Sequence, residues 1–323
     1  MRAFVLSGGG NLGPLQVGAL RALLERDIRP QMLVGCSAGA LNAAFLAREP
    51  TLEQVEHLAD MWRQVTRQDV YPNGRLSVLW RFLSGQDSLY DNRRFYAFLQ
   101  RIGVSPAWTF GQIQGARLYV TATNLRTGQL HVFGDDPNDR VLDALMASTA
   151  LTPLHPPWTV NGERYIDGGT VTPLPLRVAL ERGVREIYSL HIVSAREEEE
   201  EPGLVRGVVG LLRRSVATML RLQAQHDLLL TEERQGKIRL HHIRLSTPNP
   251  PKATDFSGEE EMFDLGYRQA VAYLEQRAGA STVSGRGSSV WWRRLAEAVG
   301  IPRRMEIPPP ERQVAGQEAL PPC

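Results

Sequence analysis

Apolar and polar positions over the first fifty residues alternate between two kinds of segment. Two short apolar runs, RAFVLS (2–7) and QMLVGC (31–36), end in glycine-containing turns and are typical of buried strands. Apolar positions at helical spacing follow each run, first from Pro14 through Glu25 and then over residues 38–48. This strand–helix–strand–helix order predicts an α/β fold with a parallel sheet.

The same reading extends along the chain to about residue 277. We expect further strands at 116–124, 128–134, 164–169, 184–193 and 238–245, and helices at 51–65, 139–149, 204–233 and 259–277. The acidic run REEEEEPG (196–203) indicates a solvated loop, because adjacent glutamates repel each other. From Ala278 onward Gly, Ser, Arg and Pro dominate, so the sequence predicts one folded domain over 1–277 and a disordered tail over 278–323.

Composition excludes several classes of protein. The 323 residues carry a net charge of +2, and no basic run is interleaved with aromatic residues, so we expect no nucleic-acid partner. The two cysteines, Cys36 and Cys323, do not make a disulfide framework, and this favours a reducing compartment. The sequence offers no signal peptide and no apolar run long enough to cross a bilayer. We therefore expect a cytoplasmic protein that reaches membranes only peripherally.

Two glycine clusters, SGGGNLG (7–13) and GCSAG (35–39), invite two interpretations. Gly8, Gly10 and Gly13 satisfy the dinucleotide-binding pattern between a strand and a helix. That mechanism also needs an acidic residue at the end of the second strand, to hold the ribose hydroxyls. Residues 28–38 contain no Asp or Glu. The dinucleotide interpretation is therefore the weaker one.

The second cluster favours a nucleophile. Ser37 lies in a G-x-S-x-G pattern between a predicted strand and a predicted helix, where Gly35 and Gly39 permit a sharp turn. Main-chain N–H groups of a nearby glycine loop would then stabilise a developing oxyanion. The alternative is an ordinary tight turn that happens to contain a serine.

A nucleophilic serine also needs a base. Asp167 ends a predicted strand and is followed by Gly168 and Gly169, which leave its carboxylate uncrowded, although Asp-Gly is also a common turn. His155, in a proline-bounded loop, is the one histidine that we retain as an alternative base, in a catalytic triad. The other six lie within predicted strands, helices and the 128–134 segment: His57, His131, His191, His226, His241 and His242.

SGGGNLG, GCSAG and YIDGG, in this order, resemble the patatin-like phospholipases, from Phe4 to about Val193 and more weakly to Arg277. The resemblance implies a three-layer α/β/α fold with a mostly parallel sheet, and a hydrolase that cleaves lipid carboxylic esters without metal or cofactor. It implies that Ser37 is the nucleophile and Asp167 the general base, with an oxyanion loop framed by Gly8, Gly9, Gly10 and Gly13.

The sequence departs from the family at Leu12, where an Arg or Lys is usual. A catalytically weak lipid-binding or scaffold protein therefore stays as an alternative. In the tail, SVWWRRLAEAVG (289–300) would form a short amphipathic helix suited to a bilayer interface. Docking of Trp291 and Trp292 on the folded domain is the competing interpretation.

Overall fold

The computed structural model describes residues 1–72, 74, 78, 80–81, 83–193, 207–232 and 238–282. The chain divides into one compact unit over Met1–Gln276 and a second over Arg277–Cys323. Both the acidic run at 196–203 and the amphipathic segment at 289–300 lie outside the described residues.

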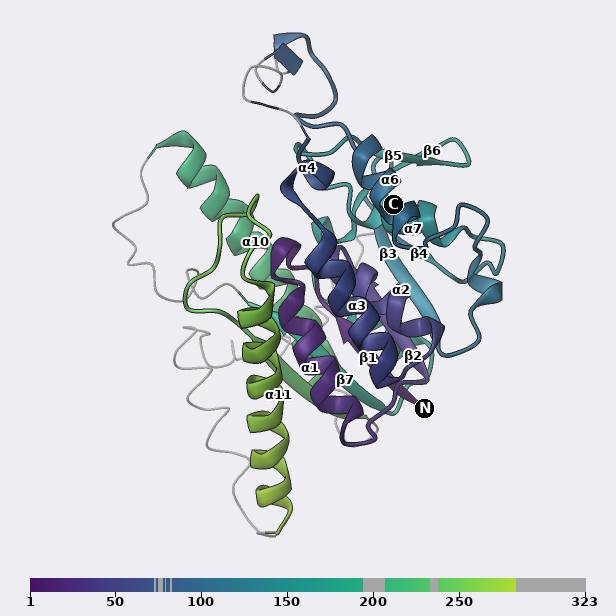
Figure 1. Cartoon of the computed structure of the whole chain (residues 1–323), viewed down its shortest axis with the longest axis vertical. Helices are drawn as coiled ribbons and strands as arrows, with labels where there is room; N and C mark the ends of the chain where they lie inside the picture. Colours follow the sequence, from purple (N-terminus) through teal and green to yellow (C-terminus); the bar gives the residue numbers. More distant parts are fainter. Residues whose placement is uncertain are drawn as a thin grey trace, which may run out of the picture. The chain divides into compact units, whose positions relative to one another are not determined.

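A mixed sheet of eight strands forms the centre of the first unit (Figure 1). Its parallel part comprises β1, β2, β3, β7 and β8, and the antiparallel strands β4, β5 and β6 lie at the β3 side. The strand order is β5 (Trp158–Val160), β6 (Glu163–Asp167), β3 (Arg117–Asn124), β2 (Met32–Cys36), β1 (Arg2–Leu6), β7 (Glu186–Ile192) and β8 (Arg239–Leu245), with β4 (Leu130–Phe133) paired to β3. This confirms the predicted α/β fold with a mostly parallel sheet.

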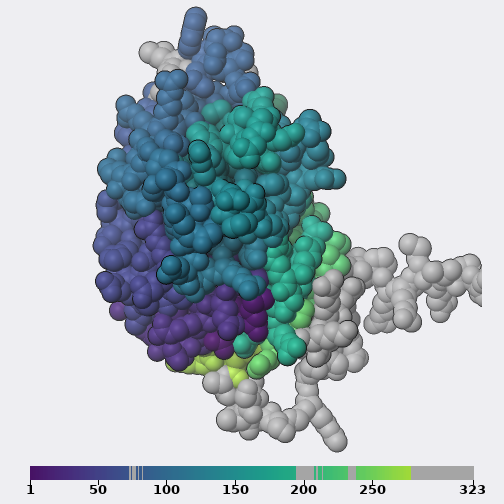
Figure 2. All heavy atoms as spheres, turned by 90° about the vertical axis from the view of Figure 1, so that its right-hand side faces the viewer, coloured from purple at the N-terminus to yellow at the C-terminus, as the bar shows by residue number. Residues whose placement is uncertain are grey.

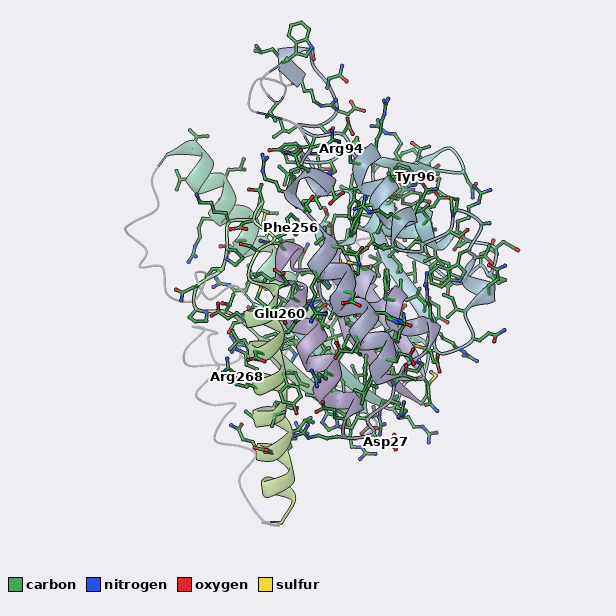
Figure 3. All side chains as sticks on the ribbon, in the orientation of Figure 1. Asp27, Arg94, Tyr96, Phe256, Glu260 and Arg268 are labelled. Atoms are coloured by element: carbon green, nitrogen blue, oxygen red, sulfur yellow. The ribbon has the colours of Figure 1, made fainter. Side chains whose placement is uncertain are left out.

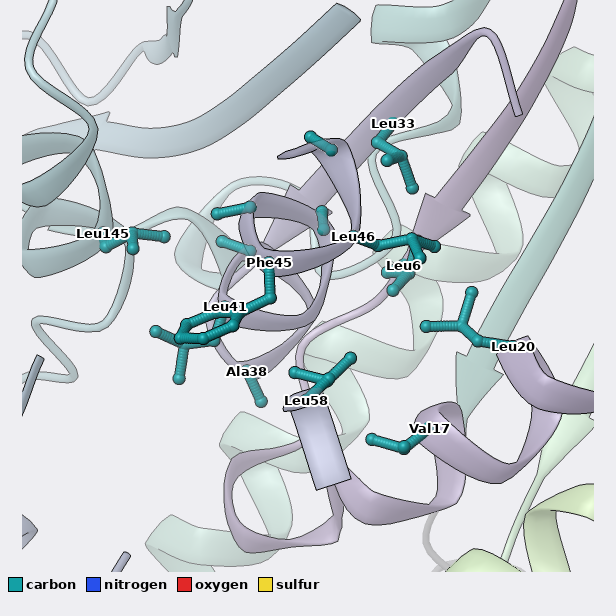
Figure 4. Close-up of a cluster of buried hydrophobic side chains, with 14 of the residues drawn as sticks. Leu6, Val17, Leu20, Leu33, Ala38, Leu41, Phe45, Leu46, Leu58 and Leu145 are labelled. Carbon is teal, nitrogen blue, oxygen red and sulfur yellow. The ribbon is translucent and has the colours of Figure 1, made fainter. Parts of the chain in front are cut away.

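Helices cover both faces of the sheet because successive side chains of a strand point to opposite faces. In β1, Phe4 and Leu6 pack with one group of helices, whereas Ala3 and Val5 pack with the other. The first group is α1 (Pro14–Leu24), α2 (Ala38–Arg48), α3 (Leu52–Gln64), α6 (Arg93–Arg101), α7 (Val141–Ser148) and α11 (Glu259–Thr282). The second is α8 (Leu176–Glu181) and α10 (Val208–Glu232). Figure 4 shows part of the first core, where Leu6 and Leu33 of the strands meet Leu20, Leu46 and Leu58 of the helices.

Helix α11 joins this first layer through an unusually close contact with α1. A Cβ on Gly18 would overlap the main chain at Phe263, and one on Gly266 would overlap the main chain at Leu15. An ion pair also links α11 to α3, since Arg63 Nε lies 2.6 Å from Glu260 Oε1, near the upper end of α11 in Figure 3. The two glycines thus let two helices approach to backbone contact.

Short elements account for most of the differences from the sequence prediction. Residues 66–115, which carry no clear pattern, contain α4 (Arg67–Val70), α6 and the 3₁₀ turn η2 (Phe110–Gln112). The remaining 3₁₀ turns are η1 (Gly10–Leu12) and η3 (Gly168–Thr170). Strand β5 and helix α8 were not expected, because runs of three to six residues give too little periodicity. Figure 2 views the side of the molecule that carries β5 and β6, where teal segments lie above the purple N-terminal ones.

Candidate active site

Ser37 occupies a strained turn between β2 and α2. It is one of three non-glycine residues with positive φ in the described chain, at φ 54° and ψ −123°. Both flanking glycines are enclosed: a Cβ on Gly35 would overlap Gly39, and a Cβ on Gly39 would overlap the end of β1. Ser148 Oγ fixes the turn by accepting a 2.9 Å hydrogen bond from the Ser37 N–H. Such strain persists only where surrounding packing enforces it, and it is typical of functional sites.

Asp167, at the carboxyl end of β6, lies in the same place. Its side chain is 3% exposed, and its Oδ1 accepts a 2.8 Å hydrogen bond from the Gly169 N–H and lies 3.8 Å from Cys36 Sγ. Burial raises the pKa of Asp167 to about 6, and hydrogen bonding from the Ser37 side chain, the Gly169 N–H and the Cys36 thiol opposes that rise. The structure therefore brings together the two residues that the motifs single out.

The first glycine cluster forms the third side of the site. A Cβ on Gly8 would lie 3.4 Å from Ser37 Cβ, so this loop passes directly beside the serine. The Gly8 N–H already donates to Pro173 O at 3.0 Å. In the part of the chain that the structure describes, the N–H groups of Gly9, Gly10 and Ala38 donate to no protein acceptor. These three groups are available to an anion, and the last lies at a helix N-terminus.

Gly13 has a different environment from the other glycines of that loop. A Cβ there would overlap the Trp62 ring, and the Gly13 carbonyl accepts a 3.1 Å hydrogen bond from Asn42 Nδ2. Asn42 in turn contacts Gln16 Oε1 at 2.9 Å and accepts from Trp62 Nε1 at 2.8 Å. Gln16 and Asn42 are fully buried, so this network fixes the loop from below.

Sequence reasoning missed these supporting residues. Asn42 is the one polar side chain between residues 38 and 47, and a polar residue inside an apolar helix was the signal that could have found it. No sequence pattern indicated Asn11. Its side-chain amide donates to Lys252 O at 2.9 Å and to Asp255 O at 2.6 Å. Leu12, the departure from the family pattern, is half-buried against the hydrophobic core.

His155, the reserve base, lies in an aromatic cluster. Its ring stacks on Tyr71 with centroids 5.4 Å apart, and Tyr71 also contacts Tyr90 and Phe256, which is labelled in Figure 3. Burial lowers the pKa of His155 to about 4. Among the described residues, no hydrogen bond links the His155 side chain to Ser37 or Asp167. His155 is therefore a neutral packing residue beside the site.

A second serine lies beside a histidine, midway along the last two strands of the sheet, β7 and β8. Ser189 Oγ is 2.7 Å from His242 Nδ1, across the directly opposed pair of β7 and β8. Burial lowers the pKa of His242 to about 4. Neither residue contacts Ser37 or Asp167 in the described part of the fold.

Within the described ranges, no group of three His, Cys, Asp or Glu side chains is placed to hold a metal ion. No described helix combines the length and the apolarity that crossing a bilayer requires.

Comparisons with known proteins agree on one family. The model of the family described as "Patatin-like phospholipase" matches residues 4–180. Lysophospholipase NTE1 of Mycosarcoma maydis is 29% identical over 200 residues, which cover 59% of this chain and 10% of that protein. Lysophospholipase nte1 of Aspergillus terreus is 25% identical over 94% of this chain and 20% of its own length. Patatin-like phospholipase domain-containing protein 7 of Rattus norvegicus is 26% identical over 61% of this chain and 14% of its own.

Solved structures give weaker matches. VipD from Legionella pneumophila aligns at a TM-score of 0.44 and 15% identity, covering 85% of this chain and 67% of that one. Human GIVD cytosolic phospholipase A2 aligns at a TM-score of 0.45 and 13% identity, covering 87% and 57%. The chain spans only about a tenth to a fifth of the length of the curated relatives named above.

Proposed function

Because this chain belongs to the patatin-like phospholipase family, we propose that it is a serine hydrolase that cleaves carboxylic esters of lipids through Ser37 and Asp167. One observation carries the proposal most directly. Ser37, held at positive φ, lies beside a buried carboxylate and beside a loop with unused N–H groups. The proposed nucleophile, base and oxyanion donors thus lie at the carboxyl ends of β2, β6 and β1.

The first half of the reaction forms an acyl-enzyme. Asp167 accepts the proton of the Ser37 hydroxyl while its oxygen attacks the ester carbonyl. The N–H groups of Gly9 and Gly10 stabilise the resulting oxyanion, together with that of Ala38. Asp167 then returns the proton to the departing alkoxide, which leaves as an alcohol, and the acyl group stays on Ser37.

Water completes the cycle. Asp167 takes a proton from a water molecule, whose oxygen attacks the acyl-enzyme, and the fatty acid leaves as the Ser37 oxygen regains its proton. A carboxylate with a pKa of about 6 is a stronger base than an ordinary aspartate and is still ionised at neutral pH. Burial of Asp167 therefore supplies what a histidine provides in other serine hydrolases.

Within the lipid esters, we propose a lysophospholipid as the preferred substrate. Several relatives carry the name lysophospholipase, and the match to the family model, over residues 4–180, includes all three motifs. A single-chain lipid also leaves a membrane more easily than a two-chain lipid, since each buried CH₂ contributes about 0.8 kcal/mol.

A catalytically weak lipid-binding protein is the second candidate, and Leu12 is the observation that favours it. Because Leu12 packs into the core, this loop lacks the cation that the family usually places there. The main-chain donors do not depend on that side chain, however. Measured turnover separates the two candidates.

The deciding experiment labels the chain with a fluorophosphonate and maps the adduct by peptide mass. We expect one adduct, on Ser37, and hydrolysis of p-nitrophenyl butyrate and of lysophosphatidylcholine. Ser37→Ala should lose both label and hydrolysis, whereas Ser189→Ala, the matched control, should keep both. An adduct elsewhere, or turnover in Ser37→Ala, would refute the assignment.

A further inference from the structure

Helix α10 exposes a stripe of large apolar side chains along its first four turns. Six of them are between 46% and 83% exposed: Val208, Leu211, Leu212, Val216, Met219 and Leu222. At 100° per residue these positions fall within about 140° of the helix circumference. Exposed apolar residues scattered singly need no explanation, but a continuous stripe marks an interaction surface.

In the sequence of α10, the charged residues that precede Asp227 all have one sign. Residues 207–226 contain Arg213, Arg214 and Arg221 and no Asp or Glu. An apolar stripe with flanking arginines is the pattern of a helix that lies in the interface of an anionic bilayer, with its apolar side chains among the acyl chains. A protein partner would need an apolar groove with acidic residues along its sides. Every part of an anionic bilayer offers acyl chains for the apolar stripe and negative headgroups for the arginines.

The other half of α10 is fixed to the loop that follows Asp167. Asp227 is buried and accepts a 2.6 Å hydrogen bond from Thr172 Oγ1, and its other oxygen lies 3.1 Å from Arg177 Nε. Gln223 Nε2 donates to Thr170 O at 3.3 Å. In Figure 1 the N-terminal part of α10 extends from there toward the upper left. The apolar stripe is therefore carried by a helix anchored at the candidate active site.

A second apolar protrusion connects to the other side of Asp167. Trp80 and Leu83 are each 71% exposed. The residues that follow them bond to the His155 loop, through Leu89 N to Pro153 O and Tyr90 N to Leu154 O. That loop also accepts the Asp167 N–H, at Ala150 O. Tryptophan is suited to the polar–apolar boundary of a bilayer.

We propose that the apolar stripe of α10, with Trp80 and Leu83, docks this chain on an anionic lipid surface, so that substrate passes from the bilayer to Ser37. This inference rests on the proposed function for the identity of the substrate. Docking itself depends on the apolar stripe and the arginines, and it is measured separately from hydrolysis.

The test uses the full chain and vesicles of phosphatidylcholine, with or without an equal amount of phosphatidylglycerol. The double variant Leu212→Glu/Met219→Glu should lose at least about tenfold in affinity for the anionic vesicles. Its melting temperature and its hydrolysis of p-nitrophenyl butyrate should not change. The matched control is Leu125→Glu, at an exposed leucine beyond β3, and it should bind like wild type.

The arginines give a second, graded measurement. Arg221→Gln should weaken binding to anionic vesicles about fivefold, as one basic residue near a charged surface contributes about 1 kcal/mol, and leave binding to neutral vesicles unchanged.

Three results would overturn the docking proposal. The first is unchanged vesicle binding in the double variant. The second is an oligomer that is smaller for the double variant than for the wild type in the absence of vesicles, which would make the apolar stripe an interface between copies of this chain. The third is a lowered melting temperature with vesicle binding intact, which would mean that another part of this chain covers it. If the double variant loses vesicle binding and the wild-type chain hydrolyses no ester, docking is supported and the proposed function is refuted.

Discussion

Ser37 and Ser189 each lie beside a buried or half-buried side chain that could act as a base, and the two pairs differ in most other respects. Ser189 and His242 sit in the middle of two paired strands, with their side chains 2.7 Å apart. Ser37 and Asp167 sit where strands end and loops begin. Ser189 is wholly buried, whereas Ser37 is partly accessible.

The main chain around each serine explains the contrast. Ser189 belongs to an extended strand whose N–H and C=O groups are engaged in the sheet. Ser37 is held at positive φ beside N–H groups that have no protein acceptor in the described residues. We therefore expect that a hydrogen bond between a serine and a base is not sufficient for catalysis. What distinguishes a nucleophile is a backbone that presents its oxygen and unused donors that can receive an oxyanion.

The largest expected effect separates the two serines directly. Ser37→Ala should lower kcat/KM for p-nitrophenyl butyrate at least about 10³-fold, because it removes the nucleophile. Ser189→Ala should stay within about twofold of wild type, although it leaves a buried imidazole without its hydrogen-bond partner and costs about 1–2 kcal/mol of stability. Equal losses of activity in both variants, measured well below their melting temperatures, would erase the contrast.

The bases should differ in the same way. Asp167→Asn keeps the shape of the side chain but cannot accept the serine proton, so turnover should fall about 10²-fold or more. His242→Gln and His155→Phe should each retain turnover within a few-fold. If His155→Phe folds normally but is inactive, and Asp167→Asn is active, then His155 and not Asp167 is the general base.

The pH profile sharpens the comparison without any substitution. The ionised form of Asp167 is the active one, so kcat/KM should fall about tenfold per pH unit below pH 6 and level off above pH 7. His155 and His242, each with a pKa of about 4, stay neutral over this range and should add no inflection. A profile governed by a group that titrates near 4 or above 7 would contradict this assignment of the base.

The smallest effect is one of stability and has the opposite sign to the effect on activity. Because the pKa of Asp167 is raised in the folded chain, the folded state binds more protons than the unfolded state between about pH 4 and 6. Stability from this group is present below pH 4 and is lost as pH rises through 6. Asp167→Asn, which cannot ionise, should therefore gain about 2 kcal/mol on wild type between pH 4.5 and pH 8. Urea unfolding of both proteins at the two pH values gives the difference in their free energies of unfolding. A difference that moves in favour of wild type from pH 4.5 to pH 8 would contradict the prediction.

The sequence predicted the strands and helices that carry the site because they are strongly apolar and glycine-containing turns mark the ends of the strands. Strands β1, β2 and β3 and helices α1 and α2 begin and end within a few residues of the expected positions. The glycine motifs then singled out Ser37 and Asp167, and the resemblance to the patatin-like phospholipases paired them. Their catalytic roles stay predictions, while their proximity is a feature of the fold.

What the sequence did not predict depends on contacts between distant residues. Gln16 and Ser148 look like ordinary helix positions, and Asn42 stands out only as a polar residue in an apolar helix. Only the fold shows that these side chains hold the loops of the site. In α10 the prediction of a helix was right, but periodic apolar residues normally indicate a buried face, and here seven large apolar side chains are exposed. Periodicity alone does not say whether a face meets the core or a different partner.

The contact between α1 and α11, together with the Asn11 bonds, has a consequence for the order of events during synthesis. Asn11 finds its acceptors 241 and 244 residues further along the chain, and Gly18 finds its neighbour only when α11 exists. At about 5–20 residues per second, the ribosome makes those acceptors roughly 12–50 s after the glycine loop itself. The nascent chain therefore contains Ser37 early, but Asn11 in the glycine loop gains its acceptors only when almost the whole folded domain has been made. Because pairing over such sequence separations is slow, final assembly of the site belongs among the last steps of folding.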